Sequence, residues 1–428
     1  MTGRGGGRCF RTSSTSSVTK GLMPNVVFAA PILSENASRM IEAVASLKDV
    51  RLGLITQDPA EKMSPSLAAN VSGHWRVNDI LDSDQLSWAA EELSKRIGRI
   101  DTLFGAYEQL QVPLAEVREK LGIEGMKPDV ARRFRDKSEM KDVLRAAGLP
   151  CAKHALVETV DEALAFTRKV GFPVVVKPPA GAGAISTFRV DDEASLREAL
   201  AKAAPRKGHA ALVEEFIVGD EYSLETISIG GHAIWHSLTH YYPTPLEAVR
   251  NPWIQWCVLS PREVNDARYD DIREAGSRAL KALGMVTGLS HMEWFRRRDG
   301  TIAISEVAAR PPGAQITTLN SRAHDIDFVR AWAEVMVSGT FAIPTRKYAV
   351  GVAFLRGQGS GKIRKVHGLD QIAREMGSLV VDVKIPTAGQ VPASSYEGDG
   401  YIILRHPETA VVMQALQRLI SVVRVELG

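Results

Sequence analysis

Two carboxylates, Glu293 and Glu306, stand on either side of Asp299-Gly300, a dipeptide typical of a two-residue type I′ hairpin turn. The flanking runs HMEWF and TIAISEV are rich in β-branched and aromatic residues, so they predict two antiparallel strands. A two-residue turn pairs residues whose numbers have a constant sum, which sets Glu293 opposite Glu306. Because like charges directly opposite each other destabilise a hairpin, a cation between them is expected, and Mg²⁺ prefers carboxylate oxygens.

Whether this pair is a metal site or a solvent-exposed surface depends on the other residues of the strand face on which it lies. By strand alternation this face also carries Phe295, Ile302 and Ile304, and Arg310 continues it beyond Glu306. A solvent-facing strand, or a bulge that shifts the register, would explain the carboxylates without a metal. A half-buried face that joins two carboxylates and an arginine favours a site.

A second stretch with binding chemistry begins at an apolar strand, 174–176, that ends in Lys177. A loop of Gly, Ala, Ser and Thr follows, whose backbone N–H groups and hydroxyls can approach an anion. The residues expected to do so are Gly181, Gly183, Ser186 and Thr187. Since the lysine precedes the glycines, the loop is not a Walker P-loop, and a plain Gly-rich turn is the alternative.

A third stretch, Glu214-Glu215-Phe216-Ile217, ends a strand predicted at 211–214, and Glu221 follows four residues later. Backbone groups at a strand end can hydrogen-bond the edge of a purine, and a carboxylate can accept from sugar hydroxyls. A strand–turn–strand with a polar tip is the alternative reading of this stretch.

The composition is that of a globular protein large enough for two or three domains. The 428 residues are 45% hydrophobic and 24% charged, and the net charge of +3 with interspersed signs argues against a nucleic-acid partner. No apolar run approaches the ~20 residues that span a bilayer. The three cysteines, Cys9, Cys151 and Cys257, are widely separated and typical of a reducing compartment, so we expect a cytoplasmic protein without a membrane partner.

Residues 1–22 contain four basic and no acidic residues and are rich in Gly, Ser and Thr, which predicts a disordered tail. A transit peptide would have this composition, but we favour an upstream extension of a reading frame that starts at Met23.

From residue 25 onward strands and helices alternate, which predicts a parallel, doubly wound sheet. The predicted strands are 26–30, 51–55 and 101–106, and the predicted helices are 34–47 and 84–97. No Gly-x-Gly-x-x-Gly follows the first strand, so a dinucleotide site is unsupported. Glu108 lies after the third strand, at the edge where such sheets bind ligands, although surface solvation explains it equally well.

The remaining elements mix helices and strands. Helices are predicted at 129–147, 161–170, 193–203 and 408–420, and a further strand at 151–156.

These stretches, in this order, resemble the ATP-grasp superfamily over roughly residues 130–340. The motifs are Arg135-Asp136-Lys137 opening a helix, Val176-Lys177-Pro178 with its glycine loop, the stretch from Glu214 to Glu221, and the Glu293…Glu306 pair followed by Arg310. Residues 349–427 look like the C-terminal lid of L-amino acid ligases and related carboxylate–amine ligases.

The resemblance implies an α/β and α+β multidomain fold. A disordered tail (1–22) would precede a doubly wound pre-ATP-grasp domain (23–128), an ATP-grasp domain of two α+β subdomains (129–345) and a small C-terminal α+β lid (346–428).

The resemblance also assigns roles to the motif residues. Lys137, Lys177 and the loop 181–187 would hold the phosphates of ATP, Glu214 to Ile217 the adenine, and Glu221 the ribose. Glu293 and Glu306 would hold Mg²⁺, with Mn²⁺ as the alternative metal, and Arg310 and Lys177 would act in catalysis. Many members carry Asn two residues after the second metal Glu, where this chain has Ala308, so one or two metal ions are left open.

The activity that the resemblance implies is ATP-dependent ligation of a small-molecule carboxylate to an amine through an acyl phosphate. A homodimer is compatible with the sequence. A biotin-carboxylase-like or purine-pathway ligase is the first alternative, and the absence of an HQK-like segment after His236 disfavours the former. A non-catalytic ATP-binding regulator is the second, and it is disfavoured by the intact lysines, carboxylates and arginine.

The substrate pocket is expected between residues 241 and 257. Its aromatics, Tyr241, Tyr242, Trp253 and Trp256, could form a binding wall, pack in the core or form a lid over the helix layer. His240 could act as a base or be structural, and His291 could support Glu293 or simply pack within its strand.

Overall fold

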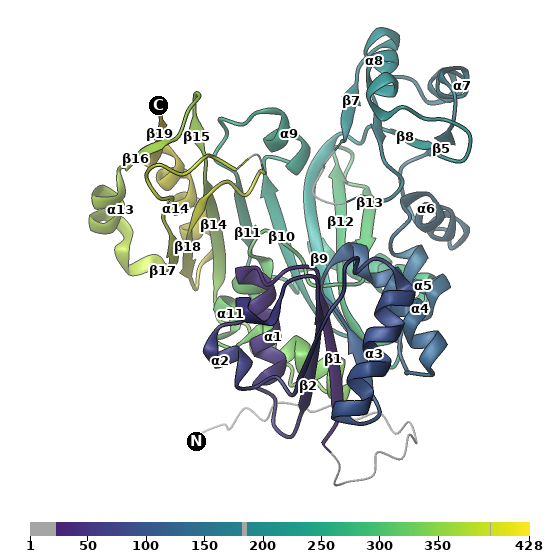
Figure 1. Ribbon diagram of the computed structural model, residues 1–428. Coiled ribbons are helices and arrows are strands. Elements are labelled where there is room, and N and C mark those ends of the chain that lie inside the picture. Colours follow the sequence, from purple (N-terminus) through teal and green to yellow (C-terminus); the bar gives the residue numbers. More distant parts are fainter. Residues whose placement is uncertain (1–22, 182–185, 394) are drawn as a thin grey trace.

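The computed structural model describes residues 23–181, 186–393 and 395–428, which fold into four sheets with helices packed on them (Figure 1). The predicted tail 1–22 and Gly183 lie outside the described residues. Within the described part of the chain, every helix is too short or too polar to cross a membrane.

The first sheet has four parallel strands in the order β3-β2-β1-β4. Its strands are β1 (Asn25–Ala30), β2 (Arg51–Thr56), β3 (Gly73–Arg76) and β4 (Thr102–Phe104). Helix α1 (Glu35–Ala45) packs on one face, and α3 (Ser83–Ile97) and α4 (Gln111–Leu121) pack on the other. The predicted doubly wound sheet is confirmed, whereas β3 was not predicted because its four residues GHWR contain no apolar run.

The largest sheet has eight strands in the order β13-β12-β9-β10-β11-β14-β18-β17, and the pairs between neighbours are antiparallel. The strands are β9 (Gly219–Ile229), β10 (His232–Tyr242), β11 (Cys257–Ser260), β12 (Gly288–Arg297), β13 (Ile302–Ala308), β14 (Ala349–Leu355), β17 (Val380–Lys384) and β18 (Gly400–His406). Because β14 pairs with β11, the predicted division at 345/346 falls within one continuous sheet, and the domain boundaries stay a prediction.

A small lobe and the C-terminal region complete the fold. In the lobe, β5 (His154–Val157), β8 (Ala211–Glu215), β6 (Val174–Lys177) and β7 (Phe188–Val190) form an antiparallel sheet that packs on α7 (Val160–Val170) and α8 (Glu193–Ala203). At the C-terminal side lie β15 (Gly357–Gln358), β16 (Ile363–His367), β19 (Arg424–Leu427), α13 (Leu369–Met376) and α14 (Thr409–Val422).

The helix predicted at 129–147 is wrong in one respect, because the structure has two helices there. Helix α5 (Pro128–Arg133) ends before α6 (Lys137–Ala146) begins. The carboxylate of Asp136 accepts hydrogen bonds from the backbone N–H groups of Ser138 and Glu139, at 2.9 Å each. This capping satisfies donors at the start of α6, so the new helix begins at Lys137.

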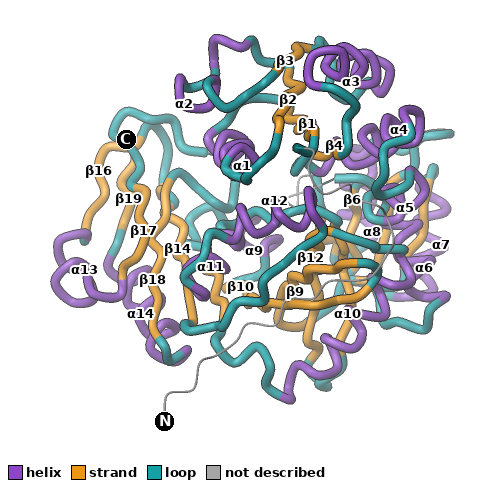
Figure 2. The backbone as a smooth tube through the Cα atoms, turned by 90° about the horizontal axis from the view of Figure 1, so that it is seen from below, coloured by secondary structure: helices purple, strands orange, loops and turns teal. Residues whose placement is uncertain are grey.

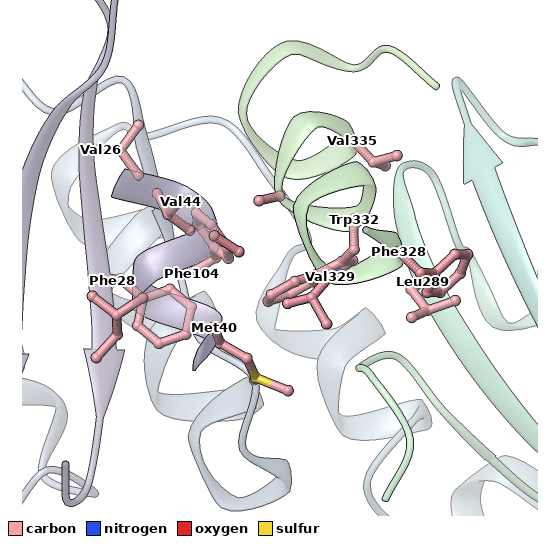
Figure 3. Packing of buried hydrophobic residues seen from close by; sticks show 14 of the residues in the cluster. Val26, Phe28, Met40, Val44, Phe104, Leu289, Phe328, Val329, Trp332 and Val335 are labelled. Carbon is pink, nitrogen blue, oxygen red and sulfur yellow. The ribbon is translucent and has the colours of Figure 1, made fainter. Parts of the chain in front are cut away.

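Helix α12 (Phe328–Ser338) lies between the first sheet and the eight-stranded sheet (Figure 2). On its first-sheet side, Trp332 makes edge contacts with Phe28 and Phe104, with ring centroids 6.5 and 5.5 Å apart (Figure 3). On the other side the same cluster includes Ile227 and Leu289 of the large sheet. Two further helices, α10 (Asp270–Leu283) and α11 (Ile316–His324), cover other parts of that sheet.

Replacing Trp332, which is 2% exposed, by Ala should lower the free energy of unfolding by about 3–5 kcal/mol, because it leaves a cavity between two sheets. Denaturant titration measures the loss. The matched control is Trp88→Ala, since Trp88 is 54% exposed and should cost much less. Equal losses for the two variants would contradict the packing role of Trp332.

Candidate active site

The hairpin β12–β13 has a three-residue loop, so the predicted two-residue type I′ turn is wrong. The backbone N–H of Arg297 donates to the carbonyl of Thr301 at 2.8 Å, and that of Gly300 donates to the carbonyl of Arg297 at 3.0 Å. Only the second residue of Asp299-Gly300 has a positive φ, 85° at Gly300, whereas a type I′ turn needs two. The carboxylate of Asp299 instead accepts the N–H of Thr301 at 3.0 Å, which stabilises the longer loop.

A β-bulge at Ser305 restores the pairing that the longer loop would have displaced. Near the turn, Arg296 pairs with Ile302, but the register shifts between Glu293 and Trp294. Beyond the shift, Glu293 lies opposite Glu306. The predicted carboxylate pair is therefore confirmed, because the extra residue in the loop and the extra residue in the bulge compensate each other.

The bulge also changes which side chains share the face of the pair. Phe295 lines the same cavity as Glu293, as predicted. Ile302 and Ile304 instead pack with Trp294 in a core cluster on the opposite face, so their predicted place beside Glu306 is wrong. A one-residue change of register moves every following side chain to the other face, which is the physical reason.

Each carboxylate of the pair faces a basic group. The Nζ of Lys137 lies 2.8 Å from Oε1 of Glu306, and also donates to the carbonyl of Gly181 at 2.9 Å. Burial raises the pKa of Glu306, but Lys137 and Lys177 outweigh it, so the pKa falls below the ordinary value. On the other strand, Nε2 of His291 lies 3.7 Å from Oε1 of Glu293. The like charges are thus offset by neighbouring cations.

His291 is held from behind by Glu225, a carboxylate with no exposed surface. Its Nδ1 lies 2.9 Å from Oε1 of Glu225, which also accepts the hydroxyl of Ser223 at 2.7 Å. Burial lowers the pKa of His291, but the two carboxylates raise it to about 9. Of the two roles considered for this histidine, its contacts favour support of Glu293.

A further carboxylate, Glu214, lies between two buried lysines. Its oxygens contact Nζ of Lys177, at the end of β6, and Nζ of Lys141, at 3.3 Å. Burial raises the pKa of Glu214, but the two lysines outweigh burial and lower it to about 2. The main chain of Glu214 pairs with β5 and β6 on its two sides. The motif predicted for adenine therefore also supplies a counter-charge for the lysines.

Arg310 forms an ion pair with Glu108, which lies in a short turn after β4 of the first sheet. The guanidinium Nε donates to Oε2 of Glu108, and Arg135 lies 3.9 Å from Oε1 of the same carboxylate. Burial lowers the pKa of Arg310, but Glu108 outweighs burial and raises it. Glu108 is buried, so solvation does not explain it. In the sequence, the indication that Glu108 belongs to the site was its position after the third predicted strand, at the carboxyl edge of a parallel sheet.

These side chains open into one cavity of about 420 Å³, which is within the range of small-molecule sites. The cavity brings together most of the residues predicted for the site: Lys137, Lys177, Gly181, Thr187, Glu214, Glu215, Phe216, Ile217, Glu221, Glu293, Glu306 and Arg310. Ser186 is described but does not line it. Burial and the neighbouring Glu293 raise the pKa of Glu221 well above its ordinary value.

The far side of the cavity is aromatic and apolar. It is lined by Tyr241, Pro245, Leu246, Trp256, Ile316 and Tyr396. Tyr396 packs edge-on against Trp256, with ring centroids 4.6 Å apart, and its place here was not predicted because it comes from the C-terminal region. The indole N–H of Trp256 donates to the carbonyl of Pro243 at 2.8 Å, so its ring presents only apolar surface.

The remaining aromatics of the predicted wall lie elsewhere. Tyr242 and Trp253 are exposed and are not part of the cavity lining, so the binding wall, one of the roles considered for these aromatics, does not include them. His240 lies between the rings of Tyr222 and Tyr242, and burial lowers its pKa to about 4. These contacts favour the structural role for His240.

Comparisons with known proteins agree with this geometry. Residues 142–324 match the ATP-grasp domain family. The L-arginine-specific L-amino acid ligase of Bacillus subtilis is 25% identical over 273 residues, which are 61% of this chain and 64% of that protein. The chain thus spans somewhat less than two thirds of this relative's length.

Two solved structures are similar in fold. The L-amino acid ligase of Bacillus licheniformis has a TM-score of 0.77 at 20% identity, covering 95% of this chain and 99% of that chain. The N5-carboxyaminoimidazole ribonucleotide synthetase of Thermotoga maritima has a TM-score of 0.67 at 17% identity, covering 95% and 100%.

Residues 142–324, which include the small lobe and most of the cavity lining, are therefore the ATP-grasp domain of this chain. The chain contains an ATP-grasp domain and resembles the L-amino acid ligases over most of its length.

The charge on Glu214 should make stability depend on pH in the acidic range. Since its pKa is about 2 in the folded chain, against an ordinary 4.5, its ionised form stabilises the fold above pH 4.5, and this is lost as pH falls towards 2. Glu214→Gln should cost about 3–5 kcal/mol at pH 7, because it leaves two buried lysines without their carboxylate.

Urea titrations from pH 7 down to pH 3 measure the effect. The difference between wild type and Glu214→Gln should shrink as the pH falls, while the exposed control Glu198→Gln should differ little at any pH. A difference that stays constant over this range would contradict the ion pairs.

Proposed function

We propose that the protein is an ATP- and Mg²⁺-dependent carboxylate–amine ligase that forms an amide or peptide-like bond. The observation that carries the proposal is the meeting of Lys137, Lys177, Arg310 and the Glu293–Glu306 pair in one cavity. Phosphoryl transfer needs positioned cations around the charge that spreads over the transferring group, and these residues supply such an arrangement.

The carboxylate pair fits Mg²⁺ in number and kind of ligand. Mg²⁺ is commonly held by one or two carboxylates together with substrate phosphates and water, and the described residues contain no group of three metal-ligating side chains. Glu293 and Glu306 would hold the ion, which when bound would neutralise phosphate charge. Ala308, two residues after Glu306, offers no side-chain ligand, so we propose one protein-held ion.

The chemistry requires two displacements and no covalent enzyme nucleophile. An oxygen of the substrate carboxylate attacks the γ-phosphorus of ATP, and the bond to ADP breaks. The amine nitrogen then attacks the acyl carbon of the acyl phosphate, loses a proton, and phosphate leaves. Lys137 and Lys177 would bind the phosphates, and Arg310, oriented by Glu108, would lie where negative charge develops. Consistent with this, burial raises the pKa of the Cys257 thiol to about 12, which disfavours it as a nucleophile.

The aromatic side of the cavity would hold the organic part of a substrate. The eight-stranded sheet places Glu306 and Glu293 on β13 and β12, Glu221 on β9, and Tyr241 and Trp256 at β10 and just before β11. Tyr241 on β10 therefore lies two strand spacings, roughly 10 Å, from Glu293 on β12, and next to the strand that carries Glu221. Amino acids are the first substrates to test, because the similar proteins include L-amino acid ligases.

The proposal also includes a cytoplasmic location, small-molecule carboxylate and amine partners, and a homodimer as the assembly to test. No nucleic acid or membrane partner is needed for this chemistry.

The test is release of ADP and phosphate from Mg-ATP in the presence of pooled amino acids and, separately, of bicarbonate with amines. Release that requires both a carboxylate and an amine is expected. Glu306→Ala should reduce it at least a hundredfold with the fold intact, whereas the exposed control Glu198→Ala should retain it. Turnover with bicarbonate alone would favour the carboxylase-type alternative, and tight ATP binding without release in any pool would favour a regulator.

Lys177→Ala should weaken ATP binding about 10- to 100-fold, because a charge-assisted hydrogen bond contributes about 1.5–3 kcal/mol. Isothermal titration with a non-hydrolysable ATP analogue measures the dissociation constant. The exposed control Lys153→Ala should leave it unchanged. An unchanged constant in Lys177→Ala would remove this lysine from the nucleotide site.

A further inference from the structure

Lys141 is a fully buried lysine for which the proposed chemistry has no use. It lies in α6 with no exposed surface, and burial lowers the pKa of its ammonium group. Placing an ammonium in the interior is unfavourable unless its donors are satisfied. Its Nζ lies 3.3 Å from Oε2 of Glu214 and donates to the carbonyl oxygen of Ser305.

Ser305, whose carbonyl Lys141 contacts, is the bulge residue of the β12–β13 hairpin. A bulge leaves its extra residue outside the ladder of strand pairs, so the carbonyl of that residue needs another donor. Lys141 supplies one. Because of the bulge, Glu306 lies on the same face as Glu293. Lys141, which holds the bulge residue Ser305, therefore also influences the position of Glu306.

Lys137 acts on the next residue of the same strand. Residues four apart on a helix lie on one face, so Lys137 and Lys141 point from α6 in the same direction. Lys137 lies 2.8 Å from the carboxylate of Glu306, while Lys141 holds the carbonyl of Ser305. Two consecutive residues of β13 are therefore held by two consecutive turns of one helix.

On its other side, Lys141 reaches the small lobe. Glu214 lies between Lys141 and Lys177, so its carboxylate joins α6 to the end of β6, where Lys177 lies. The hairpin and the lobe belong to different sheets, and they are also linked by the Arg297–Glu215 ion pair at 3.5 Å and by a bridge between Ile304 and Cys151, just before β5. Lys141 is a polar link between the two.

We propose that Lys141 is a positioning residue: by holding Ser305 and Glu214 together, it sets Glu306 and Lys177 at the separation that a metal–triphosphate unit needs. In this role it contacts neither substrate nor metal. The proposal rests on the proposed function only in that Mg²⁺ and a nucleotide are the ligands being positioned.

Lys141→Met tests the proposal, because it removes the donors and keeps an apolar side chain of similar length. The Mg²⁺ concentration for half-maximal binding of a fluorescent ADP should rise about 10- to 100-fold, as is typical when a residue that orients metal ligands is lost. ADP binding without Mg²⁺ should weaken by a smaller factor, because Lys177 keeps its own contact with Glu214. The conservative Lys141→Arg, which keeps a charge and donors, should recover part of the loss.

The matched control is Arg145→Met, the same kind of change one turn later in α6, at a residue that is exposed. It should leave the Mg²⁺ requirement unchanged. The proposal is overturned if the Mg²⁺ concentration for half-maximal ADP binding by Lys141→Met lies within twofold of that of this control. It is also overturned if Lys141→Met weakens ADP binding equally with and without Mg²⁺. If Lys141→Met does not fold, as judged by its melting curve, Lys141→Arg decides alone: an Mg²⁺ requirement equal to wild type overturns the proposal, and a raised one supports it.

The assay separates this proposal from the proposed function because ADP binding needs no turnover. A wild type that binds ADP in an Mg²⁺-dependent way but never releases ADP from ATP would refute the ligase and leave Lys141 testable. A wild type without Mg²⁺-dependent ADP binding would overturn both.

Discussion

The pairing of opposite charges among buried and half-buried side chains is the interaction on which the site depends. Four buried or half-buried carboxylates, Glu108, Glu214, Glu225 and Glu306, each face a basic group. An ion removed from water is costly alone but tolerable when paired, so each partner constrains where the other can lie. The elements that meet at the cavity, from three different sheets, are held in register by these pairs as well as by apolar packing.

The sequence was sufficient where a local period or spacing decides the structure. The alternation of strands and helices predicted the first sheet, and α8 has the bounds expected of it, 193–203. The carboxylate pair also followed from spacing, although through a wrong turn. Asp-Gly fits both a two-residue loop and a three-residue loop with Gly in the left-handed region, and residue types alone do not separate the two.

The sequence was insufficient where distant segments decide. Glu108 and Arg310 are 202 residues apart, so their ion pair depends on how two sheets pack. The contact of buried Lys141 similarly depends on the bulge at Ser305, which the periodicity of the sequence does not predict. The aromatic side of the cavity was half predicted, because Tyr241 and Trp256 belong to the expected stretch 241–257, whereas Tyr396 comes from the C-terminal region. Local rules give elements and faces, whereas the partners of buried charges come from tertiary packing.

Through the ion pair between Glu108 and Arg310, the region of the first sheet contributes a charged group to the site. A chain shortened to begin after α4 would lose the counter-charge of a buried arginine and also uncover the side of α12 that Trp332 occupies. The nucleotide-binding part should therefore not behave as an independent unit, and recombination with related chains would have to exchange the two regions together.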